Sequence, residues 1–301
     1  MFTVLKSVIL RKHNKRNSML LVIFSAAIWG LIWIPLRYME SLGLYGLWAT
    51  LYFYLIPLLP LAYFGHKKLF GDIQNIWKYL LIGFFMGGAF TCYAAGLVIA
   101  TVSKTTILYY LTPIWATLLG IIFLSERASI FRWSCIFFGL LGCTLVMQID
   151  IRNFYFELAD LWGLSSGILW GVGAIIVRYF DDLKIENSFF PIYFFSSLFT
   201  FLAILLLNFP IPSMTSFFSA FPYAAIFSIF IYLPAFLIIL RVQQYLSPGL
   251  VGVLMLSEIL LALISAKILL GEPITNLQWL GAVCIILTGL LISIVEGKKT
   301  P

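Results

Sequence analysis

One acidic side chain, Glu258, lies near the centre of an apolar segment long enough to span a membrane. An ionisable group at that depth costs roughly 2.5 to 3.5 kcal/mol on insertion scales, and such groups tend to mark substrate or ion pathways. Its helical neighbours Val251, Ala262 and Ser265 form a small-sided stripe that could line a cavity or receive another helix. We expect Glu258 to bind a cationic group of a substrate or to take up a proton; a structural pair with a buried base or hydroxyl is the alternative.

A weakly polar stripe runs along a second apolar segment. Its members recur at the helical positions i, i+4, i+7 and i+11: Thr105, Tyr109, Thr112 and Ala116. We expect this stripe to face inward, with Tyr109 and Thr112 at a substrate site. Pro113 removes a backbone hydrogen bond, and the freed carbonyl is predicted to act as a ligand or the proline as a hinge. The alternative is that the hydroxyls bond only to carbonyls of their own helix and that Pro113 merely bends it.

Four aromatic side chains complete the expected site. Trp29 and Trp170 lie well inside apolar segments, away from the membrane interfaces where tryptophan usually gathers. A ring at that depth can close a cavity or stack on a substrate, although plain packing beside small residues is the alternative. Tyr93 and Tyr232 are secondary candidates for the same cavity.

The segments that carry these residues occur twice. LTPIWATLLGIIFLSE (111–126) is echoed by SEILLALISAKILLGE (257–272), at an offset of about 146 residues that places the threonine of one copy on the glutamate of the other. SAAIWG (25–30) is echoed by SSGILWG (165–171), at an offset of about 141 residues that relates the two tryptophans. The chain therefore contains one unit in two copies.

The composition identifies the class of protein. Of the 301 residues 62% are apolar and 10% are charged, against about 25% charged in soluble domains, and the mean hydropathy is +1.04. This indicates an integral membrane protein. The net charge is +7, and we expect the basic residues beside the apolar runs to contact anionic lipid headgroups. We predict no nucleic-acid partner. The four cysteines lie in apolar runs without CxxC spacing, so we predict neither a metal site nor a disulfide framework. We also predict no cofactor.

Ten apolar runs predict an all-α protein with ten transmembrane helices. Strands are excluded because the runs are too long and too continuously apolar for a barrel, and an open sheet edge would leave backbone groups unpaired in lipid. The predicted spans are 18–37, 46–64, 77–98, 104–124, 131–149, 159–178, 189–208, 218–240, 248–270 and 276–295.

The basic residues predict the orientation of these spans. With the basic N-terminal cluster in the cytoplasm, 15 of the 19 Lys and Arg residues fall on the cytoplasmic side, and the exceptions are Arg37, Lys104, Arg152 and Lys267. Both termini are therefore predicted to be cytoplasmic, in the inner (plasma) membrane. Basic residues near span ends are expected to extend to the headgroups: Arg37, Lys104, Arg178, Arg241 and Lys267.

Five spans in each copy reverse the second copy relative to the first, so the two repeats are predicted to be inverted, as in many secondary transporters. The predicted organisation is a cytoplasmic tail (1–17), a first five-helix repeat (18–149), a second five-helix repeat (159–295) and a short cytoplasmic tail (296–301).

These segments resemble the EamA family of the drug/metabolite transporter superfamily. The resemblance covers nearly the whole chain and rests on the order, spacing and duplication of IWG (28–30), LWG (169–171), LTPIWATLLGIIFLSER (111–127) and LSEILLALISAKILLGEP (256–273). Ile259 stands where the family has a proline. The resemblance implies transport, with substrates that range over amino acids, nucleotide-linked and methyl-donor metabolites and drugs.

We therefore predict a secondary active transporter that moves a small organic metabolite, such as an amino acid, a nucleoside-linked metabolite or a drug, by alternating access through a cavity between the repeats. Its partners are the small-molecule substrate, the lipid bilayer and, for coupling, protons. No GxxxxGK[ST] loop is present, which argues against direct ATP coupling. The alternatives are a membrane-embedded enzyme, disfavoured because the span centres hold one acid and no histidine, and a helical membrane protein that does not transport.

Overall fold

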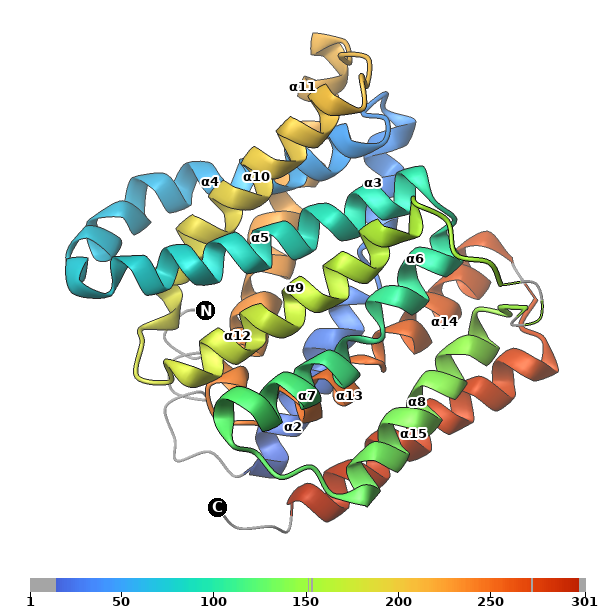
Figure 1. Cartoon of the computed structure of the whole chain (residues 1–301). Coiled ribbons are helices and arrows are strands. Elements are labelled where there is room, and N and C mark those ends of the chain that lie inside the picture. The colour runs from blue at the N-terminus through green and yellow to red at the C-terminus, as the bar shows by residue number, and fades with distance from the viewer. Residues whose placement is uncertain (1–14, 151, 153, 272, 298–301) are drawn as a thin grey trace.

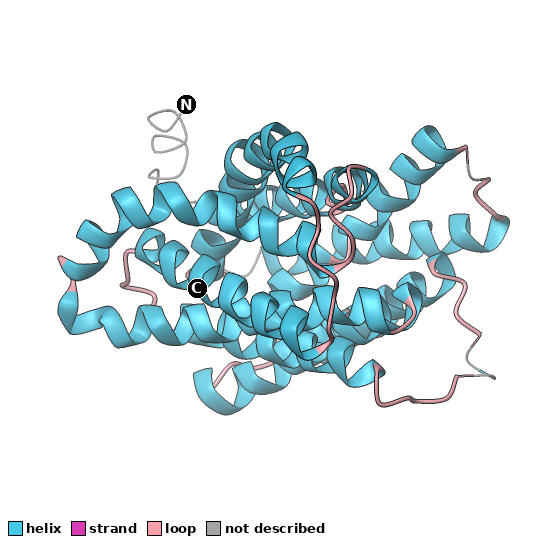
Figure 2. Cartoon of the chain, turned by 90° about the horizontal axis from the view of Figure 1, so that it is seen from above, coloured by secondary structure: helices cyan, strands magenta, loops and turns pink. Residues whose placement is uncertain are grey.

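The computed structural model describes residues 15–150, 152, 154–271 and 273–297 of the chain. Within these ranges all regular structure is helical, as Figure 2 shows, and the predicted all-α class is confirmed. Most of the predicted N-terminal tail (1–14), the last four residues (298–301) and Glu272 lie outside the described residues. Residues 15–17, which the sequence placed in the tail, already belong to the first helix.

The first half of the chain runs from Lys15 to Val146. Its elements are α2 (Lys15–Trp29), α3 (Trp33–Ser41), α4 (Leu47–Phe70), the 3-10 turn η1 (Ile73–Asn75), α5 (Ile76–Ile99), α6 (Val102–Tyr109), α7 (Thr112–Leu124) and α8 (Ile130–Val146).

The second half runs from Asp160 to Gly297. Its elements are α9 (Asp160–Tyr179), the 3-10 turn η3 (Ile185–Ser188), α10 (Phe189–Leu206), α11 (Met214–Ala225), the π-helical segment η4 (Ile226–Tyr232), α12 (Leu233–Gln243), α13 (Pro248–Met255), α14 (Glu258–Leu270) and α15 (Asn276–Gly297).

Eight helical segments of the described chain are long and apolar enough to cross a membrane, which supports a multi-pass membrane protein. The second and fifth predicted spans correspond to shorter apolar helices, Leu47–Tyr63 and Ile130–Val146. The number ten therefore stays a prediction. We call the side of the bundle at which α2 begins and α15 ends the terminal side, and the opposite side the distal side (Figure 1).

Three of the long segments are interrupted near their middle. We number them as the ten predicted spans. The first breaks at 30–32 between α2 and α3, the fourth at 110–111 between α6 and α7, and the ninth at 256–257 between α13 and α14. Non-helical backbone at membrane depth is tolerated where protein surrounds it, because its polar groups must find partners there. In agreement with this, one residue of each break is buried: Gly30, Tyr110 and Leu256.

The helices pack in pairs that cross the two halves. Helix α5 packs against α9 and α10, α2 against α12 and α13, α7 against α9 and α13, and α4 against α10. Helices α8 and α15 lie side by side at one edge of the bundle (Figure 1). The breaks of the fourth and ninth segments thus lie in the interior, between the halves.

Candidate functional site

The break of the ninth segment is held against the break of the first. An alanine Cβ at Gly30 would lie 2.1 Å from the backbone oxygen of Glu258 and 3.3 Å from the backbone nitrogen of Ala262. Further along α14, the indole Nε1 of Trp33 donates a hydrogen bond of 3.1 Å to Ser265 Oγ. The small stripe of Ala262 and Ser265 therefore receives another helix, which was one of the two functions that the sequence left open for it.

The Trp33–Ser265 contact carries a modest prediction. Ser265→Ala removes a buried acceptor, and interhelical hydrogen bonds in membranes contribute about 0.6 kcal/mol on average. We expect the free energy of unfolding to fall by that amount in detergent-based unfolding titrations. The Ser265 hydroxyl donates to the Ala262 carbonyl of its own helix, so the bond that joins the two helices is the one from Trp33. A loss above about 2 kcal/mol would contradict this view of the contact.

The Glu258 side chain lies at the first turn of α14, where it is partly exposed rather than buried. The hydroxyl of Tyr110 donates a hydrogen bond to its carboxylate, and Tyr93 and Tyr109 are close enough to interact with it electrostatically. The Tyr93 and Tyr109 rings are 4.8 Å apart, and those of Tyr109 and Tyr110 are 5.7 Å apart. We call this group of one carboxylate and three phenols the Glu258 cluster.

No ion pair engages Glu258 among the described residues, so of the alternative, a structural pair with a buried base or hydroxyl, the structure offers only the hydroxyl, that of Tyr110. Its partners are hydroxyl groups. The positive end of the α14 dipole also favours a carboxylate at this position.

Sequence reasoning missed Tyr110. It lies outside the Thr105–Tyr109–Thr112 stripe, at the break between α6 and α7, and its hydroxyl bonds Glu258 of α14. A helical period carried through an uninterrupted segment cannot find such a residue. The aromatic run Tyr109-Tyr110 directly before a Thr-Pro pair was the available signal.

Thr112 and Pro113 differ from expectation. Thr112 is buried; its Oγ1 donates to the Tyr109 carbonyl at 2.5 Å and lies 3.5 Å from the Gly167 carbonyl of α9. The Tyr109 carbonyl is the acceptor that Pro113 leaves without its helical donor, so the threonine satisfies it and no free ligand remains. Pro113 lies in the first turn of α7, after the break, where a proline costs little.

Span nine breaks without a proline. Ile259 occupies the family's proline position, yet helix α13 ends at Met255, and Ser257 Oγ donates to the Leu254 carbonyl at 2.8 Å. Both breaks thus pair a hydroxyl with a carbonyl three residues earlier. This local bond, rather than the proline, is the feature that the two copies share.

The two tryptophans meet in an aromatic cluster, which we call the aromatic plug. Phe90 of α5 stacks on Trp29 at 5.5 Å and lies 5.6 Å from Trp170. Tyr232 contacts Trp29 edge-on at 5.9 Å, and Phe236 contacts Phe90 at 5.2 Å. The rings pack on one another, which favours the packing alternative for the tryptophans in this conformation.

The aromatic plug and the Glu258 cluster are neighbours. The rings of Tyr109 and Trp170 are 6.4 Å apart and in edge-on contact, which joins the two groups. Tyr232 lies at the end of the π-helical segment and is buried. The indole Nε1 of Trp29 is buried without a hydrogen-bond partner among the described groups. The structure thus brings six of the eight sequence-predicted site residues into two connected groups, but turns Thr112 and its neighbour Pro113 towards α9 and α13.

The packing of the ninth segment differs on the two sides of its break. Every residue of α13, on the terminal side, is buried, where α13 packs against α2 and α7. Of α14, on the distal side, only Ile259 and Ser265 are buried. The ninth segment is therefore enclosed by protein on the terminal side of Glu258 and much less covered on its distal side.

Charged networks fasten both ends of the bundle. On the terminal side the Arg132 guanidinium lies 3.5 Å from Glu126 and 3.3 Å from Glu296, and donates to Ser247 Oγ at 2.9 Å. On the distal side Lys104 lies 3.2 Å from Glu157 and 3.6 Å from the buried Asp160.

Several basic residues expected to extend to the headgroups are instead paired within the protein. Lys104 contacts two acids, Arg178 bonds the Gln244 carbonyl and lies 3.5 Å from Asp181, and Arg241 pairs with Glu186. That expectation was wrong for these three, because loops at the span ends supply acceptors closer than the lipid.

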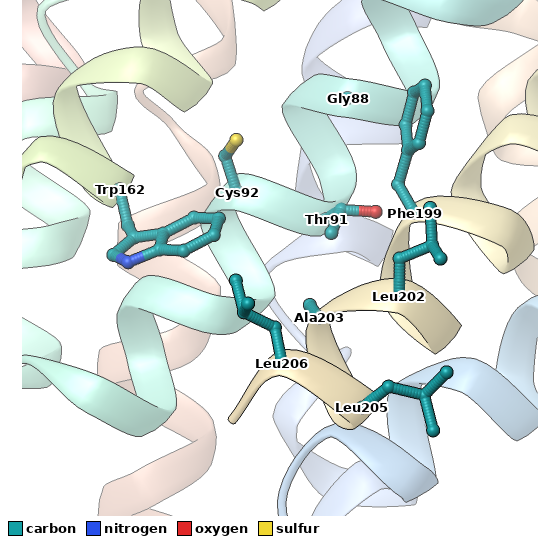
Figure 3. A pocket seen from close by; sticks show the side chains of 9 residues that line it. All are labelled: Gly88, Thr91, Cys92, Trp162, Phe199, Leu202, Ala203, Leu205 and Leu206. Carbon is teal, nitrogen blue, oxygen red and sulfur yellow. The ribbon is translucent and has the colours of Figure 1, made fainter. Parts of the chain in front are cut away.

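Two cavities lie away from these residues. One, of about 620 Å³, opens between α5, α9 and α10, and exposed leucines of α10 line its mouth (Figure 3). The other, of about 430 Å³, lies near Asp72 and Lys184 on the terminal side. Hydrogen bonds from Tyr79 (2.7 Å) and Asn75 (2.9 Å) hold the pKa of Asp72 below its usual range. None of the predicted site residues lines either cavity.

Comparison with known proteins gives the family. The profile described as the EamA-like transporter family matches residues 16–148 and again residues 157–294. A Bacillus subtilis (strain 168) protein described as "Uncharacterized transporter YoaV" is 22% identical over 171 residues, which span 53% of this chain and 56% of that protein. A solved structure, described only as "Crystal structure of protein", is similar in fold with a TM-score of 0.70 and 16% identity, over 93% of this chain and 96% of that one. Since the family profile covers most of the sequence in two successive matches, this chain is a member of the EamA-like transporter family.

Proposed function

We propose that this membrane transporter is a secondary active carrier that moves a small organic metabolite past the Glu258 cluster by alternating access. The observation that carries the proposal is the state of Glu258: a carboxylate at the break of an interrupted segment, partly exposed, and neighboured by hydroxyls rather than bases. Ionisable groups kept inside a membrane protein without an ion-pair partner are expected to serve substrates or ions.

The pairing of helices supports two inverted repeats, 18–149 and 159–295. Exchanging the first five predicted spans with the last five maps the α5–α9 contact onto the α12–α2 contact, and the α7–α9 contact onto the α13–α2 contact. The contacts α4–α10, α7–α13 and α8–α15 map onto themselves. A two-fold axis in the membrane plane would produce this pattern, and the two successive family matches agree with it.

The unequal packing around Glu258 supports alternating access. The buried helix α13 lies on the terminal side of Glu258, while most side chains of α14, on the distal side, are at least partly exposed. With the termini placed in the cytoplasm of a plasma membrane, this conformation is closed towards the cytoplasm. Exchange of conformations between the inverted repeats would then open the other side.

Transport by the purified chain in liposomes tests the proposal. Counterflow of amino acids, amines and nucleosides is measured with and without an imposed pH gradient, on wild type, Glu258→Gln and the control Glu40→Gln, which removes an exposed acid of α3. We expect at least one solute to move, with a loss of tenfold or more in Glu258→Gln and little change in Glu40→Gln.

The pH gradient separates the two proposed roles of Glu258. Dependence of flux on the gradient that is lost in Glu258→Gln indicates a proton site, whereas loss of affinity alone indicates a substrate contact. Failure of every solute to move would favour a membrane protein that does not transport. Equal flux by wild type and Glu258→Gln would remove Glu258 from the mechanism.

A further inference from the structure

We propose that the Glu258 cluster recognises the ammonium group of an organic cation that also carries an apolar, preferably aromatic, body. This inference rests on the proposed function, since it names the substrate class of the same site. It combines three observations: a carboxyl group with no ion-pair partner among the described residues, aromatic rings around that group, and apolar walls beside it.

In the part of the chain that the structure describes, no base pairs with Glu258, and the bases nearest along the same helices are engaged elsewhere. Lys104, at the distal end of α6, is held by Glu157 and Asp160 at 3.2 and 3.6 Å. Lys267, near the distal end of α14, lies over the Trp279 ring at 6.0 Å. An anionic substrate would therefore meet an uncompensated carboxylate, whereas a cation would supply the missing charge.

The rings suit an ammonium group. Tyr93, Tyr109 and Tyr110 stand around Glu258, and a cation over a tyrosine face is attracted by the ring quadrupole, more strongly when water is excluded. Two of the phenol hydroxyls already have hydrogen-bond partners. The Tyr110 hydroxyl bonds Glu258, and the Tyr93 hydroxyl lies 3.3 Å from Thr106 Oγ1. A proton site alone would need the carboxylate but not the three faces.

The apolar body has walls to lie against. Beside Tyr110, side chains from α6 and α14 are partly buried and packed on an apolar cluster, among them Ile107, Leu260 and Leu263. On the other side Tyr109 leads to the Trp170 ring at 6.4 Å. A ligand with its charge at Glu258 therefore meets apolar surface in both directions, and burying that surface contributes affinity.

Binding of a matched series of probes tests the inference. The series is phenethylamine, its N,N,N-trimethyl derivative, 2-phenylethanol and 3-phenylpropionate, which share the ring and differ in charge. Binding to the purified full chain in nanodiscs is measured by titration calorimetry at pH 7. We expect the two cations to bind at least tenfold more tightly than the alcohol and the carboxylate.

Variants assign the preference to the cluster. Glu258→Gln should abolish the discrimination between cation and alcohol, Glu258→Asp should retain part of it, and Glu40→Gln should leave it intact. Tyr109→Phe keeps a ring face and should bind the trimethyl probe as wild type does, whereas Tyr109→Leu should weaken that binding about fivefold or more. Melting temperatures show whether each variant is folded. If Glu258→Gln does not fold, the comparison of Tyr109→Phe with Tyr109→Leu still tests the inference.

The inference is overturned if no cation binds at millimolar concentration, if the alcohol binds as tightly as the amine, or if Glu258→Gln leaves the preference unchanged. It fails separately from the proposed function. Glu258-dependent binding of cations without any flux in liposomes would support the site and refute transport. Flux of an anion or neutral solute that the cations do not inhibit would support transport and refute the inference.

Discussion

Gly30→Ala is expected to destabilise the protein by about 3 kcal/mol or more, at the upper end of the range for overpacked sites. The new Cβ would lie 2.1 Å from the backbone oxygen of Glu258, well inside van der Waals contact. A backbone carbonyl cannot rotate away as a side chain can, so the first and ninth segments must separate. Because Glu258 begins α14, we also expect the transport activity of any folded fraction to fall.

Two matched controls make this prediction specific. Gly171 is the repeat-related glycine of the second WG motif, but a Cβ there would meet Trp115 Cβ at 3.3 Å, so Gly171→Ala should cost about 1 kcal/mol or less. A Cβ at Gly289, in α15, would meet no atom within 4 Å, so Gly289→Ala should be nearly neutral. Unfolding titrations and melting in detergent measure all three. Equal effects at Gly30 and Gly171 would show that the contact between the breaks is not as tight as described.

Arg132→Met is expected to destabilise the protein by about 3 to 5 kcal/mol, the usual cost of breaking a buried ion pair by removing one partner. The side chains of Arg132 and Glu296 are 7% and 5% exposed, so the remaining carboxylate has little access to water. Glu126 and Ser247 would also lose their contacts with the guanidinium. These residues join the loop after α7, the start of α8, the loop before α13 and the end of α15.

The double variant Arg132→Met/Glu296→Gln separates two causes of the destabilisation: the loss of the guanidinium beside the Glu296 carboxylate, and the loss of packing around Arg132. If loss of the guanidinium beside the Glu296 carboxylate causes most of the destabilisation, neutralising Glu296 should restore a large part of the stability. The control Arg37→Met removes an exposed arginine and should change stability by less than about 1 kcal/mol. Thermal unfolding in one detergent compares the four proteins. A similar loss in Arg132→Met and Arg37→Met would mean that the terminal-side network contributes little.

The sequence predicted most of the secondary structure, because long apolar runs and their basic flanks have few alternatives in a membrane. The predicted span 248–270 coincides with α13 and α14 together, and 77–98 differs from α5 by one residue at each end. The breaks were not predicted with equal success. Pro113 suggested a hinge in the fourth segment, but the ninth breaks without a proline because Ser257 supplies the local hydroxyl bond.

The candidate site was only partly predictable. Glu258 could be found from the sequence because an ionisable side chain in an apolar run is costly to insert into a membrane. Trp29 and Trp170 could be found because they occupy equivalent positions in the two copies of the repeat. Thr112 was expected to face the same cavity because it is the repeat equivalent of Glu258. It instead lies against Gly167, since the residue that fills a given space depends on how closely the neighbouring helix approaches.

The sequence by itself determined the class of protein, the helices, the duplication and the family, since all four depend on composition, periodicity and order along the chain. Only the tertiary structure decided the surroundings of Glu258: that a Cβ at Gly30 would clash with its backbone, that Tyr110 bonds its carboxylate, and that Lys104 is held by other acids. These facts depend on distances between segments far apart in the chain, which helical periodicity does not contain. Burial and pairing of a charge follow from such distances, and with them the chemistry that the site can perform.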